Sequence, residues 1–259
     1  MPNVSRTKRH GLRAVVTVAL LATGSGSALA DSYNLRTYFE SLQPSYPVQA
    51  ASNQWSFYAG SAIGGSLISP SGANYYGPET YQQIGTLVDT GTSGCTSGFC
   101  PPDPSTTLAS FDGVFVHPGS ANPTSVVFRA DSAMTVTKLD LLSETVGNGN
   151  LGNGFDVSVR SYTGGSYHSI GSFGFSYGTT LTSFNQTIYN SPVALSAGEF
   201  IEISYGNAGN YGYDHGNINV TVTTGAVTAP VPEPETYAML LAGLGLLGLA
   251  RRRARAAGR

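Results

Sequence analysis

Polar and apolar residues alternate along much of this chain with a period of two. Residues 155–160 read Phe-Asp-Val-Ser-Val-Arg, and residues 218–223 read Ile-Asn-Val-Thr-Val-Thr. Successive side chains of a strand point to opposite faces, so this period places one face in a core and the other in water. No stretch of residues 31–229 keeps a 3.6-residue apolar period over three turns. The pattern therefore predicts an all-β body.

Turn residues separate the alternating runs, as they do between the short strands of all-β proteins. We predict ten strands: Asn53–Ala59, Gln82–Leu87, Gly113–Val116, Ser125–Ala130, Met134–Glu144, Gly154–Tyr162, Ser166–Phe175, Ser183–Tyr189, Phe200–Tyr205 and Ile218–Thr223. A short helix is expected at Asn34–Glu40. A body of about 200 residues of this kind is one domain, so the predicted fold class is a single antiparallel β-sandwich over residues 31–225.

The first 30 residues have the three parts of a secretory signal peptide. Basic residues lie between Arg6 and Arg13, residues 14–22 are apolar, and Ala28-Leu29-Ala30 forms an A-x-A cleavage site. The apolar part is too short for a permanent membrane span. We expect signal peptidase to cut after Ala30, so the mature chain begins near Asp31.

The other end combines a proline-acid motif, a short apolar helix and a basic stop. Val231, Pro232, Glu233 and Pro234 precede the apolar segment Tyr237–Ala250, and Arg251, Arg252 and Arg253 follow it. A helix of that segment spans roughly 21 Å, short of the roughly 30 Å hydrocarbon core, so a transient anchor is favoured. The arginines hold its C-terminal side in the cytoplasm.

This order of features resembles the PEP-CTERM sorting signal of exosortase substrates. The resemblance implies handling by an exosortase in the inner membrane of a Gram-negative bacterium, followed by delivery to the cell surface or to an extracellular polysaccharide matrix. The signal would occupy residues 231–259, joined to the body by a linker at 226–230. An ordinary tail anchor with a coincidental Pro-Glu-Pro is the alternative.

Removing both ends changes the charge of the protein. Residues 31–232 contain four cations and 13 carboxylates, so the net charge moves from −2 for the whole chain to −9. Nucleic acid is excluded as a partner, because phosphate binding requires a basic surface. Like-charge repulsion is expected to keep the body soluble.

The chain has only two cysteines, Cys95 and Cys100. Export places them in an oxidising compartment, so we expect a disulfide, which would stiffen the tip of a long loop at 93–107 rather than hold the domain together. The alternative is a metal site, but C-x4-C without a second Cys/His pair nearby is a weak pattern.

No motif indicates catalysis. The sequence lacks a G-x-S-x-G nucleophile elbow, an H-E-x-x-H motif and a P-loop. His117, His168 and His215 fall in separate turns, and His117 is interpreted as a turn cap.

Carboxylates offer another route to catalysis, since glycosidases use two acids roughly 5 to 9.5 Å apart. Glu199 and Glu202 are three residues apart on one strand and would point to opposite faces, with Glu199 at the start of the strand. The fold could assemble a pair such as Asp112 and Asp214, but no pattern favours it. We therefore expect a protein that is not an enzyme, with a secreted carbohydrate-active hydrolase as the alternative.

No cofactor is expected, apart from a structural calcium ion. Hard cations take oxygen ligands from flexible loops rich in glycine and asparagine, and residues 147–154 and 206–214 have this composition. Asn210 and Asp214 are the candidate ligands. There is no D-x-D-x-D spacing, and such loops also form for turn geometry alone.

Five further runs share a layout: Phe111–Gly119, Ser125–Ala130, Gly154–Val159, Leu195–Ile203 and Gly209–Asp214. Their order resembles a β-sandwich module of secreted bacterial proteins, similar to carbohydrate-binding jelly rolls. The resemblance implies a jelly-roll-like sandwich, and such modules are usually non-catalytic.

Aromatic rings are the candidates for sugar binding, because sugars pack their CH faces on exposed rings while polar side chains reach their hydroxyls. The candidate rings are Trp55, Tyr75, Tyr76, Tyr81, Tyr162, Tyr167, Tyr211 and Tyr213. The pairs 75/76 and 211/213 are expected to be exposed. The alternative is that most of these rings fill the core or flank strands.

These features predict an exported, non-catalytic protein of the cell surface or extracellular matrix that binds exopolysaccharide. The expected partners are signal peptidase, exosortase and exopolysaccharide, with transient contact to the inner membrane through the C-terminal apolar helix. A purely structural component of a surface coat is a further alternative.

Overall fold

The fold of the body is all-β, as the alternation predicts. The computed structural model describes residues 30–71, 74–91, 109–145, 152–176, 180–181, 192–209, 212, 214–225, 244 and 251. Every pairing between the described strands is antiparallel.

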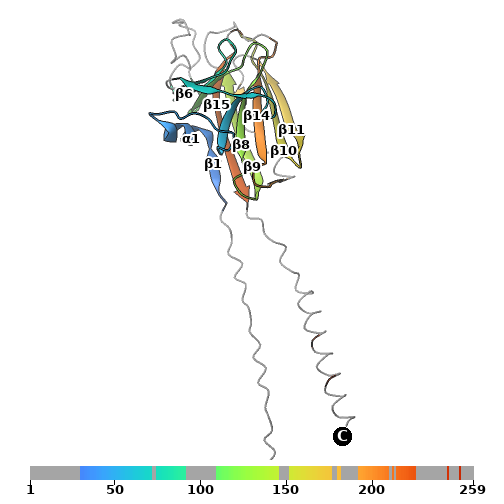
Figure 1. The fold of residues 1–259 in the computed structure, drawn as a ribbon. Helices are drawn as coiled ribbons and strands as arrows, with labels where there is room; N and C mark the ends of the chain where they lie inside the picture. The colour runs from blue at the N-terminus through green and yellow to red at the C-terminus, as the bar shows by residue number, and fades with distance from the viewer. Residues whose placement is uncertain are drawn as a thin grey trace, which may run out of the picture.

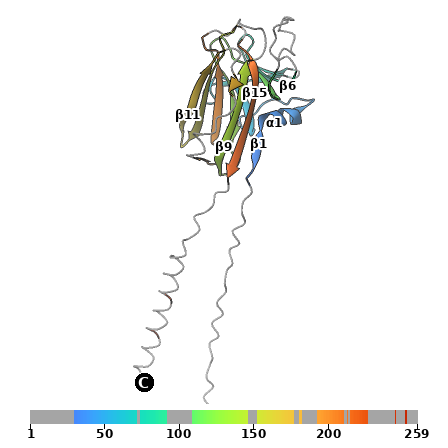
Figure 2. The same ribbon diagram turned by 180° about the vertical axis from the view of Figure 1, so that it is seen from behind.

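The strands form two sheets (Figures 1 and 2). Sheet A runs in the order β12 (Thr180–Leu181), β9 (Met134–Thr145), β15 (Gly216–Gly225), β7 (Gly113–His117), β6 (Gln83–Val88), β5 (Asn74–Tyr76) and β4 (Ser69–Ser71), with β1 (Ser32–Asn34) paired to β15 and β13 (Val193–Leu195) paired to β9. Sheet B runs in the order β11 (Ser166–Phe175), β10 (Phe155–Thr163), β14 (Phe200–Gly206), β8 (Thr124–Arg129), β2 (Trp55–Ala59) and β3 (Ser66–Leu67).

One hydrophobic cluster takes side chains from both sheets. On β10, Phe155, Val157 and Val159 are buried in this core, whereas Asp156 on the other face is exposed. β15 repeats the pattern with Ile218, Val220 and Val222. The largest fully buried side chains include Trp55, Tyr75, Tyr205, Phe39, Phe57, Phe128 and Phe155. Each apolar side chain of this size contributes about 1.5–3 kcal/mol when it is fully buried.

Nine of the ten predicted strands are confirmed to within two residues, and the tenth, Ser183–Tyr189, lies outside the described residues. The prediction missed β1, β3, β4, β5, β12 and β13. Each of these has only two or three residues, too few for alternation to register. β4 also contains Pro70, which a strand at the edge of a sheet tolerates because its outer N–H groups have no strand partner.

The predicted helix is also confirmed, shifted to Leu35–Leu42 and labelled α1. Asn34 is its N-cap, and its side-chain oxygen accepts a hydrogen bond of 3.0 Å from the backbone N–H of Thr37. Leu35 and Phe39 enter the core, where the Phe39 ring stacks on Phe57 of β2 with 5.0 Å between centroids. The helix is therefore part of the packing between the two sheets.

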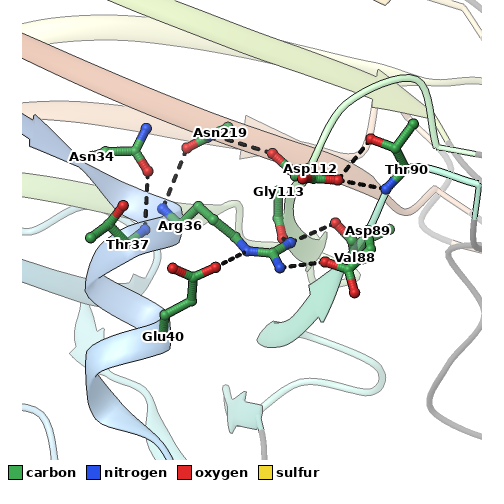
Figure 3. A network of polar contacts seen from close by, with 10 residues as sticks. All are labelled: Asn34, Arg36, Thr37, Glu40, Val88, Asp89, Thr90, Asp112, Gly113 and Asn219. Atoms are coloured by element: carbon green, nitrogen blue, oxygen red, sulfur yellow. Dashed lines mark hydrogen bonds and ion pairs between the residues drawn. The ribbon is translucent and has the colours of Figure 1, made fainter.

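Arg36 ties the first turn of α1 to sheet A (Figure 3). Its Nη1 donates to the carbonyl oxygens of Val88 and Gly113, at 2.7 and 3.0 Å, and its Nε donates to Glu40 at 2.9 Å. Its Nη2 forms an ion pair with Asp89. The guanidinium thus holds the end of β6 and the start of β7 against the helix.

The first and last strands of the body lie side by side (Figures 1 and 2). β1 pairs with β15, with Ser32 opposite Thr223, and the Thr224 N–H donates to the Asp31 carbonyl at 2.9 Å. The segments that precede and follow the body therefore leave it from the same end. Among the described residues, no helix is long and apolar enough to cross a bilayer.

Candidate functional site

The candidate site is the outer face of sheet B, which points away from the core. The strand register places its side chains in rows across β8, β14, β10 and β11. The first row is Arg129, Phe200, Tyr162 and Tyr167; the second is Val127, Glu202, Arg160 and Ser169; the third is Ser125, Ser204, Ser158 and Ser172. We call these the aromatic row, the charged row and the serine row.

The aromatic row contains two half-buried tyrosines. The Tyr162 ring stacks on Phe200 with 5.0 Å between centroids and meets the Tyr167 ring edge-on at 5.1 Å. The guanidinium of Arg129 lies 4.6 Å from the centre of the Phe200 ring. Two adjacent rings therefore keep part of their surface in water while Phe200 fixes their position from one side.

The charged row is built around Glu202, whose side chain is 0% exposed. Its Oε1 accepts hydrogen bonds from Arg160 Nη2 at 2.7 Å and from Ser204 Oγ at 2.9 Å. Its Oε2 accepts from Tyr167 Oη at 2.7 Å and from the Ala62 N–H at 3.0 Å. The Arg160 guanidinium also lies 3.9 Å from the centre of the Tyr167 ring. Arg160 and Tyr167 are thus held in place by the same carboxylate.

The loop between β2 and β3 reaches across this face to the same carboxylate. Ser61 Oγ lies 2.6 Å from Tyr167 Oη and donates to Glu202 at 3.3 Å, next to the bond from the Ala62 N–H. The following residue, Ile63, is 51% exposed. Both oxygens of Glu202 are therefore used to anchor strands and a loop.

The structure corrects part of the predicted set of sugar-binding rings. Trp55 is 1% exposed and Tyr75 is 0% exposed, so neither can offer a ring to a ligand, and the expected exposure of Tyr75 is wrong. Tyr75 points inward from β5, packs edge-on against Phe39, and donates its hydroxyl to the Pro47 carbonyl at 2.9 Å. Tyr76 is half-buried, and residues 211 and 213 lie outside the described residues.

Asp214, a candidate calcium ligand, is 1% exposed. Its Oδ1 accepts hydrogen bonds from the N–H groups of Asn153 and Gly154, at 2.8 and 2.9 Å, and its Oδ2 has no hydrogen-bond partner. Burial raises its pKa to about 6, against the opposing effect of these two bonds. The described residues contain no group of three His, Cys, Asp or Glu that could hold a metal, and Asn210 lies outside them. A calcium site therefore stays a prediction.

The other predicted acids hold backbone in place. Glu199 directly precedes β14, as expected, and accepts hydrogen bonds of 2.7 Å from the N–H groups of Ser196 and Gly164, which lower its pKa. Asp112 accepts from the N–H and hydroxyl of Thr90, at 2.6 and 2.7 Å. Asp112 and Asp214 thus each serve a different loop.

Two histidines that are far apart in sequence meet in the fold. His117 and His215 are buried and stack with 5.9 Å between ring centroids. Burial lowers the pKa of both, and that of His215 to about 4. His117 is the last residue of β7 rather than a turn residue, and its Nδ1 lies 2.6 Å from the Pro118 carbonyl. His168 is exposed on β11.

Most residues of the two predicted sorting segments, and both cysteines, lie outside the described residues: Ala28, Cys95, Cys100, Val231, Pro232, Glu233, Pro234, Arg252 and Arg253. Ala30 is exposed, two residues before β1, and Arg251 is exposed and helical. Signal-peptide cleavage and the disulfide stay predictions.

The sequence did not single out Arg160 or Ser61, and Glu202 entered only as half of a rejected catalytic pair. Alternation does place Arg160 and Glu202 on the outer sides of their strands. However, these residues are 42 positions apart, and no local pattern says that β10 and β14 are neighbours.

Comparison with known proteins identifies the tail. The family profile of the PEP-CTERM protein-sorting motif matches residues 230–255. This match supports the resemblance drawn from the sequence: the chain carries the sorting motif of an exported protein that an exosortase processes. No curated protein matches the chain.

Proposed function

We propose that the protein is a non-catalytic component of the cell surface or extracellular matrix, and that its body is a β-sandwich that binds exopolysaccharide on the outer face of sheet B. The sorting motif at residues 230–255 supports delivery to that location. The observation that carries the proposal is the pair of half-buried rings, Tyr162 and Tyr167, beside the fixed guanidinium of Arg160.

This arrangement has the chemistry that a sugar polymer needs. Exposed ring surface packs against the CH faces of sugars, and hydroxyl and guanidinium groups bond to their hydroxyls. Ser158 is half-buried and Ser172 is exposed, so the serine row offers hydroxyls two rows from the rings, on the far side of Arg160. Glu202 and Phe200 already fix the tyrosines and Arg160. Binding would therefore immobilise few further side chains, and its cost in conformational entropy would be small.

The carboxylates of the body support a binding role over a hydrolytic one. Glu202 and Glu144 are both buried and both accept several hydrogen bonds from neighbouring strands and loops. A glycosidase instead needs two acids that face the same scissile bond. The remaining described acids that the sequence offered, Glu199, Asp112 and Asp214, hold separate loops.

The test is retention of the purified surface form on the host's own exopolysaccharide. Tyr162→Ala should weaken binding by about 3- to 10-fold, because one ring contact contributes about 0.5–1.5 kcal/mol. Tyr76→Ala is the matched control, since Tyr76 is also half-buried but lies on sheet A. No retention of the wild type, or equal losses in both variants, would contradict the proposal.

Mass spectrometry of the same surface form tests the sorting route. The mature chain is expected to begin near Asp31 and to lack Arg251, Arg252 and Arg253. A surface form that retains either end would show that the corresponding segment is not a removed signal.

A further inference from the structure

Every cation of the body is already engaged within the fold. Residues 31–232 contain only four, and all of them are described: Arg36 binds Glu40 and Asp89, Lys138 binds Asp140 at 2.6 Å, Arg160 binds Glu202 at 2.7 Å, and Arg129 binds the Gly198 carbonyl and the Phe200 ring. A body with a net charge of −9 thus holds no cation free of these internal contacts.

Among the strand residues named for the outer face of sheet B, two cations, Arg129 and Arg160, are matched by two carboxylates, Glu202 and Asp156, so the face carries no net charge. Its charged row contributes a guanidinium that is cancelled by the fully buried Glu202, to which Arg160 donates from both Nε and Nη2. Further along β10, Asp156 is exposed on the same face and adds negative charge. A polymer with a carboxylate or sulfate in each repeat would find no net positive charge on this face, and the body's net charge of −9 would repel it.

Uncharged groups dominate what the face does offer. Tyr162 and Tyr167 supply ring surface, and Ser158 and Ser172 supply hydroxyls. Arg160 is 32% exposed, and its bonds to Glu202 use Nε and Nη2, so Nη1 is left to donate to a hydroxyl. The carboxylate of Asp156 can accept a hydrogen bond from another hydroxyl of the ligand.

We infer that the ligand of this face is an uncharged polysaccharide. The inference rests on the proposed function and narrows it, because a surface of rings, hydroxyls and internally neutralised charge selects for hydroxyl-rich chains and against acidic ones. Its binding should then depend little on ionic strength, since contacts without net charge are not screened by salt.

The experiment separates the host's exopolysaccharide by anion exchange into an uncharged flow-through and a bound acidic fraction. Each fraction is cast into a native gel, and the retardation of the purified surface form is compared with that of Tyr162→Ala and Tyr76→Ala. We expect retardation in the uncharged fraction, little changed by a roughly tenfold increase in salt and reduced about 3- to 10-fold in Tyr162→Ala only. Dextran and galactomannan serve as uncharged probes of known structure, and alginate as an acidic one.

The two levels of the hypothesis fail differently. Retardation by the acidic fraction or alginate alone, lost at high salt, would overturn the uncharged ligand and leave polysaccharide binding intact. Retardation by neither host fraction would overturn polysaccharide binding itself. Retardation by the uncharged fraction that is equal in all three proteins would place the contact elsewhere on the body and overturn the inference for this face.

Discussion

The outer faces of the two sheets each bury one glutamate, but the surroundings differ. On sheet B, Glu202 accepts from Arg160, Tyr167, Ser204 and the β2–β3 loop, and the side chains of Arg160 and Tyr167 are partly exposed. On sheet A, Glu144 accepts from the N–H and hydroxyl of Ser110 and from Asn217 Nδ2 at 3.1 Å. All four cations of the body bind elsewhere, so Glu144 has no cationic partner.

The surroundings show which face keeps polar and aromatic side chains in contact with water. On sheet A the chain closes over its own polar groups: Asn217 also donates to the Phe111 carbonyl, and a Cβ at Gly113 would lie 2.1 Å from Asn217 Oδ1, so a larger residue does not fit there. On sheet B the buried carboxylate instead positions groups whose other surfaces remain in water. A buried network is covered by the chain on sheet A, whereas a similar network on sheet B holds side chains that remain partly exposed.

Replacing Glu202 with alanine should have the largest effect. The change leaves Arg160 charged and without its carboxylate partner, and it removes one hydrogen-bond acceptor from each of Tyr167 and Ser204. Removing one member of a buried ion pair costs about 3–5 kcal/mol in the free energy of unfolding, measured by urea denaturation. Glu199→Ala is the control, because that partly exposed acid holds only two backbone N–H groups, and its loss should lower the free energy of unfolding much less. Equal losses would mean that Glu202 acts as one more loop anchor.

Replacing Glu144 with alanine should cost less, about 2–3 kcal/mol, because hydrogen-bond donors lose their acceptor but no cation is left unpaired. Glutamine variants sharpen the difference. Glu144→Gln keeps an acceptor for Ser110, whereas Glu202→Gln removes the charge that Arg160 needs. A larger urea-midpoint shift for Glu144→Gln than for Glu202→Gln would reverse the comparison between the two faces.

The sequence predicted the strands far better than it predicted the site. Alternation identifies which residues of β10 and β14 face outward, because the period of a strand is a local property. It does not show that Arg160 lies opposite Glu202, since strand order depends on loop closure between distant segments. For the same reason Tyr75 was expected at the surface: its neighbours are turn residues, but α1 packs over it through Phe39.

Asp214 is a third buried carboxylate, and it has neither a cationic partner nor a hydrogen-bond donor to its Oδ2. Its replacement should have the smallest effect on the free energy of unfolding, and that effect should depend on pH. Its pKa of about 6 lies above the ordinary 3.8, so its contribution to stability is fully present below pH 3.8 and is lost as pH rises through 6. Asp214→Asn should therefore gain stability relative to the wild type across this range, by about 1–3 kcal/mol, in urea titrations with EDTA.

His215 should show a pH dependence opposite to that of Asp214. Its pKa of about 4 lies below the ordinary 6.5, so its contribution is present above pH 6.5 and is lost as pH falls towards 4. In the wild type the losses from Asp214 and His215 run in opposite directions between pH 4 and 6 and largely cancel, whereas Asp214→Asn removes the opposing loss and its stability should fall more steeply on acidification. Parallel profiles for the two proteins would contradict this pairing. Calcium added at pH 8 gives a further test. If it raises the urea midpoint of the wild type but not that of Asp214→Asn, the Oδ2 atom of Asp214 binds the ion, and a cation from solution supplies the partner that this buried carboxylate lacks among the described residues.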